Sequence, residues 1–251
     1  MRSYKDIVYK EIDGQSLALD IHIPECEEFS VFIFFHGGGL EAGDKDAANI
    51  FAPYLAENKI ATVSANYHMY PKAEFPDYLM DSADVVDYVK KNISKYGKCD
   101  KIYLGGSSAG GYISMMLCFD DKYLGAHGIK PTDIAGYVHN AGQPTSHYNI
   151  LRERKIDSRR VIVDDTAPLY FICEKEYSPM LFIVSEFDMT NRYEQTLLTM
   201  STLRHFGQGD KISYKFMEGK RHCQYDGERD ENSVSVLGKM ILEFIKNTEN
   251  K

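Results

Sequence analysis

The chain has 251 residues, 43% of them hydrophobic, and its formal net charge is −8. This length and composition suffice for one domain with a large core. Nucleic acid is excluded as an expected partner, because an acidic chain gains nothing from a phosphate backbone. The sequence contains no run of 18 apolar residues, so we expect no membrane span. No apolar stretch of the kind found in signal peptides follows Met1–Asp6, so we expect no signal peptide.

The cysteines are widely spaced and odd in number, with no CxxC pair: Cys26, Cys99, Cys118, Cys173 and Cys223. This usage predicts reduced thiols in a cytoplasmic protein, not a disulfide framework or a zinc site. The histidines lack metal-ligand spacing, and no dinucleotide or phosphate loop occurs, so we expect neither a metal nor a cofactor. Cys223 is a disfavoured nucleophile, because its sequence neighbour His222 is rarely placed to activate it.

Strand-like and helix-like segments alternate through most of the chain, which favours an α/β fold with a mainly parallel sheet and helices on both faces. Apolar runs and alternation predict strands at 16–23, 31–35, 60–65, 102–104, 134–138, 180–184 and 212–216. Helical spacing predicts three core-facing stripes: Leu79, Ala83, Val86 and Ile93; Tyr193, Leu197, Met200 and Leu203; Val234, Leu237, Ile241 and Phe244.

Residues 141–178 interrupt this alternation between the fifth and sixth predicted strands. The segment contains Pro144, several arginines and the apolar cluster Pro168–Ile172. We expect it to form a small cap-like insertion at the edge of the site, within a single domain that spans residues 1–251.

A sequence of the form G-x-S-x-G, Gly106–Gly110, follows the predicted strand at 102–104. Glycines two residues before and after Ser108 allow a strand to turn sharply into a helix, and such a turn exposes the serine hydroxyl. The amides at the start of the following helix favour negative charge there. We therefore predict Ser108 as the nucleophile, in preference to Ser107. The alternative is a glycine-rich turn without catalysis.

A glycine loop, His36-Gly37-Gly38-Gly39, follows the apolar strand at 31–35. Backbone without side chains can approach an acyl oxygen closely. We expect the amides of Gly38 and Gly39, together with that of Ala109, to form an oxyanion hole. His36 is expected to hold the loop in shape by hydrogen bonding rather than to act as a base.

A serine nucleophile needs a base that removes its proton, and in the chain order serine, acid, histidine the base comes late. His222 is the predicted base, because it lies in a polar loop after the last predicted strand. His205 lies on a predicted helix and is expected in solvent. Three other histidines precede the expected acid and are out of order: His127, His139 and His147.

The acid should follow the predicted strand at 180–184, where Asp188 is placed to orient the imidazole. Glu186 is its rival. Asp226 and Glu228, just past the predicted base, are expected to be solvated charges.

With these motifs the chain resembles α/β-hydrolases of the group that contains hormone-sensitive-lipase-like and acetyl or feruloyl esterases. The matching pieces are His36–Gly39, Gly106–Gly111 and Asn66–Pro71, the last being similar to a tyrosine-arginine-leucine-proline segment of these esterases. The resemblance spans roughly residues 15–248. It implies a catalytic triad of Ser108, Asp188 and His222, with an oxyanion hole formed by Gly38, Gly39 and Ala109.

The chain departs from the group's pattern at three positions. His68 replaces the usual arginine, Ser107 stands where aspartate is common, and Leu40 stands where related arylformamidases tend to have tryptophan. The short N-terminus lacks the long helical cap of the larger lipases. This implies small acyl groups or an open site.

We therefore expect a serine esterase that acts on short acyl esters through an acyl-enzyme. The resemblance, with 18 tyrosines that could line a sugar-facing cleft, favours acetyl or feruloyl groups on carbohydrate. The expected partner is a small ester or an acylated oligosaccharide, and a homodimer is left open. The alternatives are a peptidase or amidase of the same fold, and a non-catalytic binding protein on a hydrolase scaffold.

Overall fold

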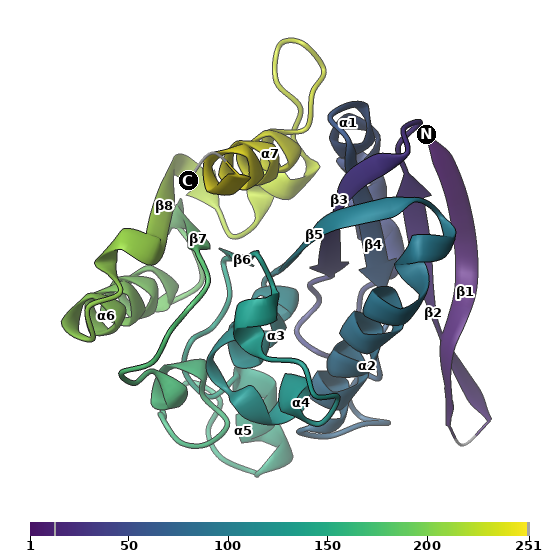
Figure 1. Cartoon of the computed structure of the whole chain (residues 1–251). Coiled ribbons are helices and arrows are strands. Elements are labelled where there is room, and N and C mark those ends of the chain that lie inside the picture. Colours follow the sequence, from purple (N-terminus) through teal and green to yellow (C-terminus); the bar gives the residue numbers. More distant parts are fainter. Residues whose placement is uncertain (13, 250–251) are drawn as a thin grey trace.

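The computed structural model describes residues 1–12 and 14–249. Its centre is one eight-stranded sheet with the strand order β1-β2-β4-β3-β5-β6-β7-β8 (Figure 1). The strands are β1 (Arg2–Ile12), β2 (Gln15–Ile23), β3 (Glu28–Phe35), β4 (Ile60–Ala65), β5 (Lys98–Ser107), β6 (Gly136–Asn140), β7 (Met180–Phe187) and β8 (Ile212–Arg221). The strands from β4 to β8 in this order pair in parallel, while β1 and β2 are antiparallel. The predicted mainly parallel sheet is confirmed.

The edge strand β1 is absent from the pattern-based prediction. It is half-exposed or exposed along its whole length, so it has no fully buried face that would appear in the sequence as a regular apolar pattern. Charged residues interrupt its apolar positions, and its strand geometry comes from pairing with β2. A strand of this kind is recognisable only from its tertiary partner.

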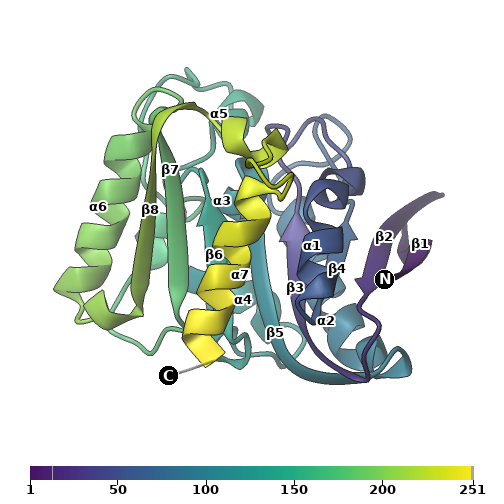
Figure 2. The same cartoon turned by 90° about the horizontal axis from the view of Figure 1, so that it is seen from above.

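Helices cover both faces of the sheet, as predicted. The helices are α1 (Ala52–Glu57), α2 (Asp77–Asn92), α3 (Ala109–Phe119), α4 (Asp121–Gly125), α5 (Tyr148–Glu153), α6 (Arg192–His205) and α7 (Val236–Glu249). α1 and α7 lie side by side on one face, and α2, α3 and α6 lie on the other (Figures 1 and 2). The predicted stripes on α2 and α7 are buried, except that Val234 precedes α7 and is half-buried.

The predicted stripe on α6 is only half correct. Met200 and Leu203 are buried, but Leu197 is 37% exposed. The buried side is rotated toward Thr196 and Thr199, whose hydroxyls donate to the carbonyls four residues earlier at 2.8 Å. Because these hydroxyls are satisfied within the helix, they can be buried at little cost, and hydrophobic periodicity does not detect them.

The segment 141–178 contains α5 and a 3-10 helix, Pro168–Phe171. It packs on α3 and on the glycine loop: the Tyr112 hydroxyl donates to the Thr166 carbonyl, and Asn149 Nδ2 donates to the Gly39 carbonyl at 2.9 Å. The segment is therefore attached to the edge of the sheet where the parallel strands end.

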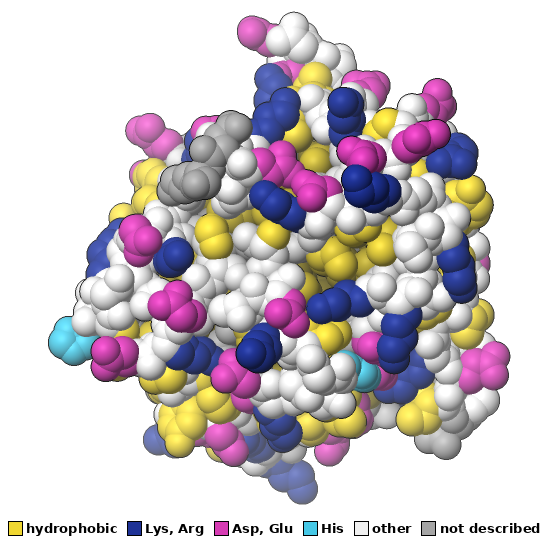
Figure 3. Space-filling view, viewed as in Figure 1, with side chains coloured by type: hydrophobic (Ala, Val, Ile, Leu, Met, Phe, Trp, Pro, Cys, Tyr) yellow, Lys and Arg dark blue, Asp and Glu magenta, His cyan; other side chains and the backbone are white. Residues whose placement is uncertain are grey.

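On the face seen in Figure 3, acidic and basic side chains are interspersed and no broad basic surface is present. Across residues 1–12 and 14–249, none of the helices combines the length and the apolar character needed to cross a bilayer.

Four segments that carry predicted site residues start at the carboxyl ends of parallel strands. The glycine loop follows β3, Ser108 follows β5, Asp188 follows β7 and His222 follows β8. The chain proceeds from β3 to β4 on one side and then to β5 on the other, so the strand order reverses at β3. Ligand sites of open α/β sheets form at such a reversal, outside the carboxyl ends.

Candidate active site

Ser108 occupies a strained turn between β5 and α3, with φ 55° and ψ −111°. Its amide donates to the Asn140 carbonyl at 2.8 Å, which fixes the turn against β6. The flanking glycines are required by close backbone packing: a Cβ at Gly110 would lie 1.9 Å from the Phe35 carbonyl oxygen, and one at Gly106 would lie 2.4 Å from Gly110. The turn therefore presents the Ser108 hydroxyl at the end of the sheet.

The structure brings Ser108, His222 and Asp188 into one chain of hydrogen bonds. His222 Nε2 lies 2.8 Å from Ser108 Oγ, and His222 Nδ1 lies 2.5 Å from Asp188 Oδ1. An ionised carboxylate only accepts, so Nδ1 carries the proton and Nε2 accepts from the serine hydroxyl. This is the tautomer in which the imidazole can take a proton from Ser108.

The Asp188 side chain is buried, with 1% of its surface exposed. Burial acts to raise the pKa of Asp188, but the hydrogen bond and charge of His222, with the amides of Met189 and Ser185, outweigh burial and hold it below its ordinary value. The carboxylate thus stays ionised. Glu186, its rival, is exposed and accepts from the amide of Gly219 at 2.8 Å instead.

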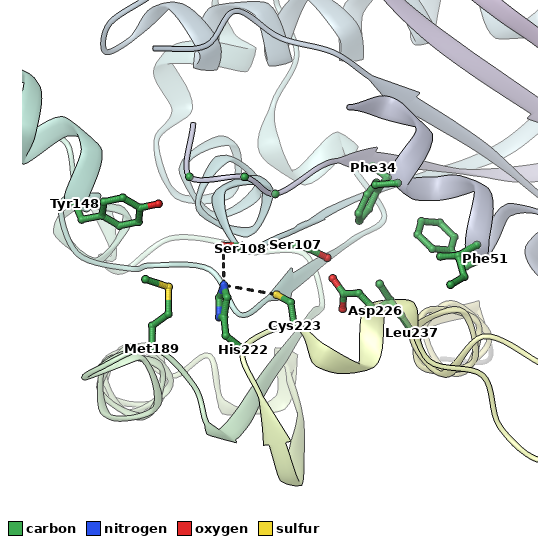
Figure 4. A pocket seen from close by; sticks show the side chains of 15 residues that line it. Phe34, Phe51, Ser107, Ser108, Tyr148, Met189, His222, Cys223, Asp226 and Leu237 are labelled. Atoms are coloured by element: carbon green, nitrogen blue, oxygen red, sulfur yellow. Dashed lines mark hydrogen bonds between the residues drawn. The ribbon is translucent and has the colours of Figure 1, made fainter. Parts of the chain in front are cut away.

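Cys223 is close to the imidazole but is poorly suited as a nucleophile. Its Sγ lies 3.8 Å from His222 Nε2 (Figure 4). Burial raises the pKa of the Cys223 thiol well above its ordinary value, and a thiol that stays protonated is a weak nucleophile.

The glycine loop passes close to Ser108. A Cβ at Gly37 would lie 3.2 Å from the Cβ of Ser108. The loop's carbonyls are used elsewhere: that of Gly38 accepts from the amides of Glu41 and Ala42, and that of Gly39 accepts from Asn149. Within the described residues, no backbone carbonyl accepts from the amides of Gly38 or Gly39. These amides therefore remain available to an oxyanion.

His36 supports this loop, as expected. Its Nδ1 lies 2.7 Å from the Gly37 carbonyl, and its ring stacks on Tyr67 with centroids 4.5 Å apart. The Tyr67 hydroxyl donates to the His36 carbonyl at 2.9 Å. Burial lowers the pKa of His36, so the ring is neutral and does not compete with His222 as base.

The segment Asn66–Pro71 is anchored through His68. The backbone amide of His68 donates to Asp81 Oδ2 at 2.9 Å, and its Nδ1 lies 2.8 Å from the same oxygen. Lys10 pairs with Asp81 Oδ1 at 2.7 Å. The imidazole thus ties the segment to α2. Within the same segment, the amide of Tyr70 donates to the carbonyl of Leu40 beside the glycine loop.

A cavity of about 380 Å³ opens beside Ser108 and His222. Tyr148 and Met189 lie on one side of the imidazole, and Phe34, Phe51, Asp226 and Leu237 lie on the other (Figure 4). Its lining is completed by Gly37, Gly38, Gly39, Ala47, Ile50, Ser107 and Cys223.

The prediction that Asp226 is a solvated charge is wrong. It lies in a 3-10 helix, Gln224–Gly227, that folds back against the sheet, and its half-buried side chain lines the cavity. Burial raises the pKa of Asp226 to about 6. Glu228 is half-buried and pairs with Lys220 at 2.8 Å, outside the cavity lining.

Sequence reasoning also missed Asn140 and Arg192. The Asn140 side chain links Ser107, Asp226 and the Tyr225 hydroxyl, while its carbonyl holds the nucleophile's amide. The buried guanidinium of Arg192 donates to the carbonyl of Ala141. The position of Asn140 at the carboxyl end of β6, the same edge as the other site segments, was the available signal.

The sheet order, the covering helices and the sharp turn at Ser108 are those of the α/β-hydrolase fold. Residues 19–125 match the BD-FAE family model. The match begins within β2 and ends with α4, and it includes the glycine loop and the turn at Ser108. The resemblance predicted from the sequence is thereby confirmed.

The chain is similar to an AB hydrolase superfamily protein of Schizosaccharomyces pombe, with 36% identity over 88 residues, which are 34% of this chain and 26% of that protein. It is also similar to a probable isoprenylcysteine alpha-carbonyl methylesterase of Arabidopsis thaliana, with 31% identity over 113 residues, which are 44% of this chain and 27% of that protein. The chain thus spans about a quarter of the length of these curated relatives.

Among solved structures, the chain is similar to esterase 2 of Thermogutta terrifontis, phosphoramylated by tabun. The TM-score is 0.79 at 20% sequence identity, and the superposition covers 98% of this chain and 92% of that one. At this identity the likeness establishes the fold.

We expect Gly38→Ala to lower kcat/KM for 4-nitrophenyl acetate by about 10²- to 10³-fold, the effect of losing an oxyanion donor. A Cβ at this position, where φ is +113°, would lie 1.9 Å from the Ala42 carbonyl oxygen, so the backbone of the loop must move. Gly128→Ala is the matched control. Its φ is +69° with no atom within 4 Å of the added Cβ, so it carries a backbone penalty far from the site. Activity of Gly38→Ala within threefold of the control would contradict the oxyanion assignment.

Proposed function

We propose that the protein is a serine carboxylic-ester hydrolase that acts on short acyl esters through an acyl-enzyme. The observation that carries this proposal is the hydrogen-bonded series Ser108, His222 and Asp188 beside a glycine loop with available amides. Acyl transfer needs these two parts together: an activated hydroxyl and donors for the oxygen that becomes negative.

In the first step, Ser108 Oγ attacks the ester carbonyl carbon while its proton passes to His222 Nε2. The carbonyl oxygen becomes an oxyanion and accepts from the amides of Gly38, Gly39 and Ala109. When the C–O bond to the alcohol breaks, His222 donates its proton to the leaving oxygen. Water then attacks the acyl-enzyme by the same path, and the carboxylic acid leaves. Asp188 stabilises the imidazolium in both steps without taking its proton.

The size of the cavity supports a small acyl or aryl-acyl group. Its volume of about 380 Å³ lies near the lower end of ordinary ligand pockets. The segment 141–178 acts as a small cap in this proposal, because its Tyr148 lines the cavity. The Tyr148 hydroxyl packs closely on the glycine loop: a Cβ added at Gly39 would lie 2.1 Å from it. Acetyl or feruloyl groups on carbohydrate are the proposed substrates. The BD-FAE match and the aromatic lining support them.

A cytoplasmic location, where imported acylated oligosaccharides would be the substrates, is part of the same proposal. The five cysteines are all free thiols, which supports a reducing compartment.

The test is covalent labelling by a fluorophosphonate together with turnover of matched 4-nitrophenyl acetate and 4-nitroacetanilide. We expect one label per chain, located on Ser108 by peptide mass spectrometry, and turnover of the ester well above that of the anilide. The structural neighbour from Thermogutta terrifontis, itself described as phosphoramylated by tabun, motivates the reagent. Absence of a label at excess reagent would indicate a binding protein, and preferred anilide cleavage would indicate an amidase.

A further inference from the structure

We propose that Asp226 is a specificity-determining residue, whose carboxylate accepts a hydrogen bond from a hydroxyl on the substrate group that enters the apolar side of the cavity. This inference rests on the proposed ester hydrolysis at Ser108. It adds a requirement on the substrate that the triad and the oxyanion loop do not impose.

The apolar side of the cavity is defined here as the space between Phe34, Phe51 and Leu237, extended by Ala47 and Ile50. The rings of Phe34 and Phe51 meet edge to face with centroids 5.0 Å apart. These walls come from β3, the segment before α1, and α7, so an apolar group of the substrate can be enclosed on several sides. Asp226 supplies the carboxylate in this lining.

The carboxyl group of Asp226 points into this space, close to Ser107 and Leu237 (Figure 4). Asn140 Nδ2 donates to Asp226 Oδ1 at 2.8 Å. The hydroxyl of Ser107, the positive charge of a protonated His222 and the thiol of Cys223 also act to lower its pKa, but burial outweighs them. A carboxylate has about four lone-pair positions, so these donors leave capacity toward the cavity.

Within the described residues, no lysine or arginine forms an ion pair with Asp226. A carboxylate beside apolar walls, with no lysine or arginine paired to it, is costly to keep ionised, and the raised pKa reflects that cost. Selection for stability alone would favour an apolar or neutral side chain at position 226. A carboxylate kept at such a cost indicates a ligand that compensates it.

A hydroxyl on an otherwise apolar group fits this environment best. The aromatic walls accept the apolar part, and a neutral hydroxyl loses less hydration on entering them than an ammonium group. An alkyl or unsubstituted aryl group would displace water from Asp226 without replacing its hydrogen bond. Sites built to bond a substrate hydroxyl strongly reject the analogue that lacks it, because a buried polar group is then left unpaired.

The experiment compares two matched ester pairs, since either side of the ester could enter the space. Ethyl 3-(4-hydroxyphenyl)propanoate and ethyl 3-phenylpropanoate differ by one hydroxyl on the acyl group. 2-(4-Hydroxyphenyl)ethyl acetate and 2-phenylethyl acetate differ by the same hydroxyl on the alcohol. We expect the wild-type protein to prefer the hydroxylated member of one pair by tenfold or more in kcat/KM at pH 8.

Asp226→Leu should reduce this hydroxyl preference to about one. Asp226→Asn, which keeps the shape and an acceptor for Asn140, should reduce it several-fold because a neutral amide oxygen accepts more weakly. The readout is a ratio within each variant, so it does not depend on the fraction of folded protein. Glu228→Gln is the matched control: it removes a nearby carboxylate of the same loop that is paired with Lys220 outside the cavity, and the preference should persist.

Equal turnover of both members of each pair by the wild-type protein would overturn the inference while leaving ester hydrolysis intact. A hydroxyl preference that survives both Asp226 variants would overturn it as well. If the wild-type protein hydrolyses none of the four esters and takes no fluorophosphonate label, the proposed function fails, and the inference fails with it.

Discussion

Ser108→Ala is expected to lower kcat for ester hydrolysis by about 10⁴- to 10⁶-fold. The substitution removes the oxygen that His222 Nε2 contacts at 2.8 Å, and with it the covalent step. The residual rate should still exceed the uncatalysed reaction, because the amides of the glycine loop can polarise the carbonyl for attack by water. Initial rates with 4-nitrophenyl acetate and loss of fluorophosphonate labelling measure the effect.

Ser107→Ala is the matched control for this variant. The neighbouring hydroxyl is buried and accepts from Asn140 Nδ2 at 2.8 Å, not from His222. We expect the Ser107→Ala protein to take the fluorophosphonate label and to retain a kcat within about tenfold of the wild-type value. A Ser108→Ala protein that is folded by circular dichroism and still turns over at the control's rate would refute the assignment of the nucleophile.

Asp188→Asn is expected to lower kcat by about 10⁴-fold with the fold intact, as loss of the acid's charge does in characterised serine proteases. The amide would donate to His222 Nδ1 and stabilise the tautomer with a proton on Nε2, which cannot accept from Ser108. The charge that stabilises the imidazolium is lost as well. Both carboxylate oxygens also accept backbone amides, from Met189 and Ser185, so one amide donor of the new side chain must face another donor.

Glu186→Gln separates the two acids that the sequence offers. This side chain is two residues away and exposed, and it accepts from the amide of Gly219 on β8. We expect kcat within about twofold of the wild-type value. Single-turnover measurement of the acylation rate in both variants distinguishes them. A larger loss in Glu186→Gln than in Asp188→Asn would reverse the assignment.

Much of the fold could be predicted because local pattern and global arrangement agree. The central strands are buried on both faces and appear as apolar runs, and the stripes on α2 and α7 face the core as expected. The exception on α6 has a definite cause. Thr196 and Thr199 satisfy their hydroxyls within the helix, so their burial leaves no hydrophobic signal in the sequence.

The contact among Ser108, Asp188 and His222 could also be anticipated, since each residue follows a parallel strand and the carboxyl ends of those strands share one edge. The expected chain order of serine, acid and histidine then predicted which strand end carries the nucleophile, which the acid and which the base. Spacing alone could not separate Asp188 from Glu186. Only the turn after β7 decided which carboxylate is buried against the imidazole.

The sequence by itself determined the class of fold, the nucleophile turn and the residue types that could meet there, because glycine and apolar patterns act through local backbone geometry and burial. The tertiary structure alone decided the surroundings of the site. Asp226 resembles a surface charge in the sequence, yet its 3-10 helix packs against β6 and α7 and turns the carboxylate into the cavity. Whether a charge is desolvated depends on elements distant in the chain, and no local pattern records their approach.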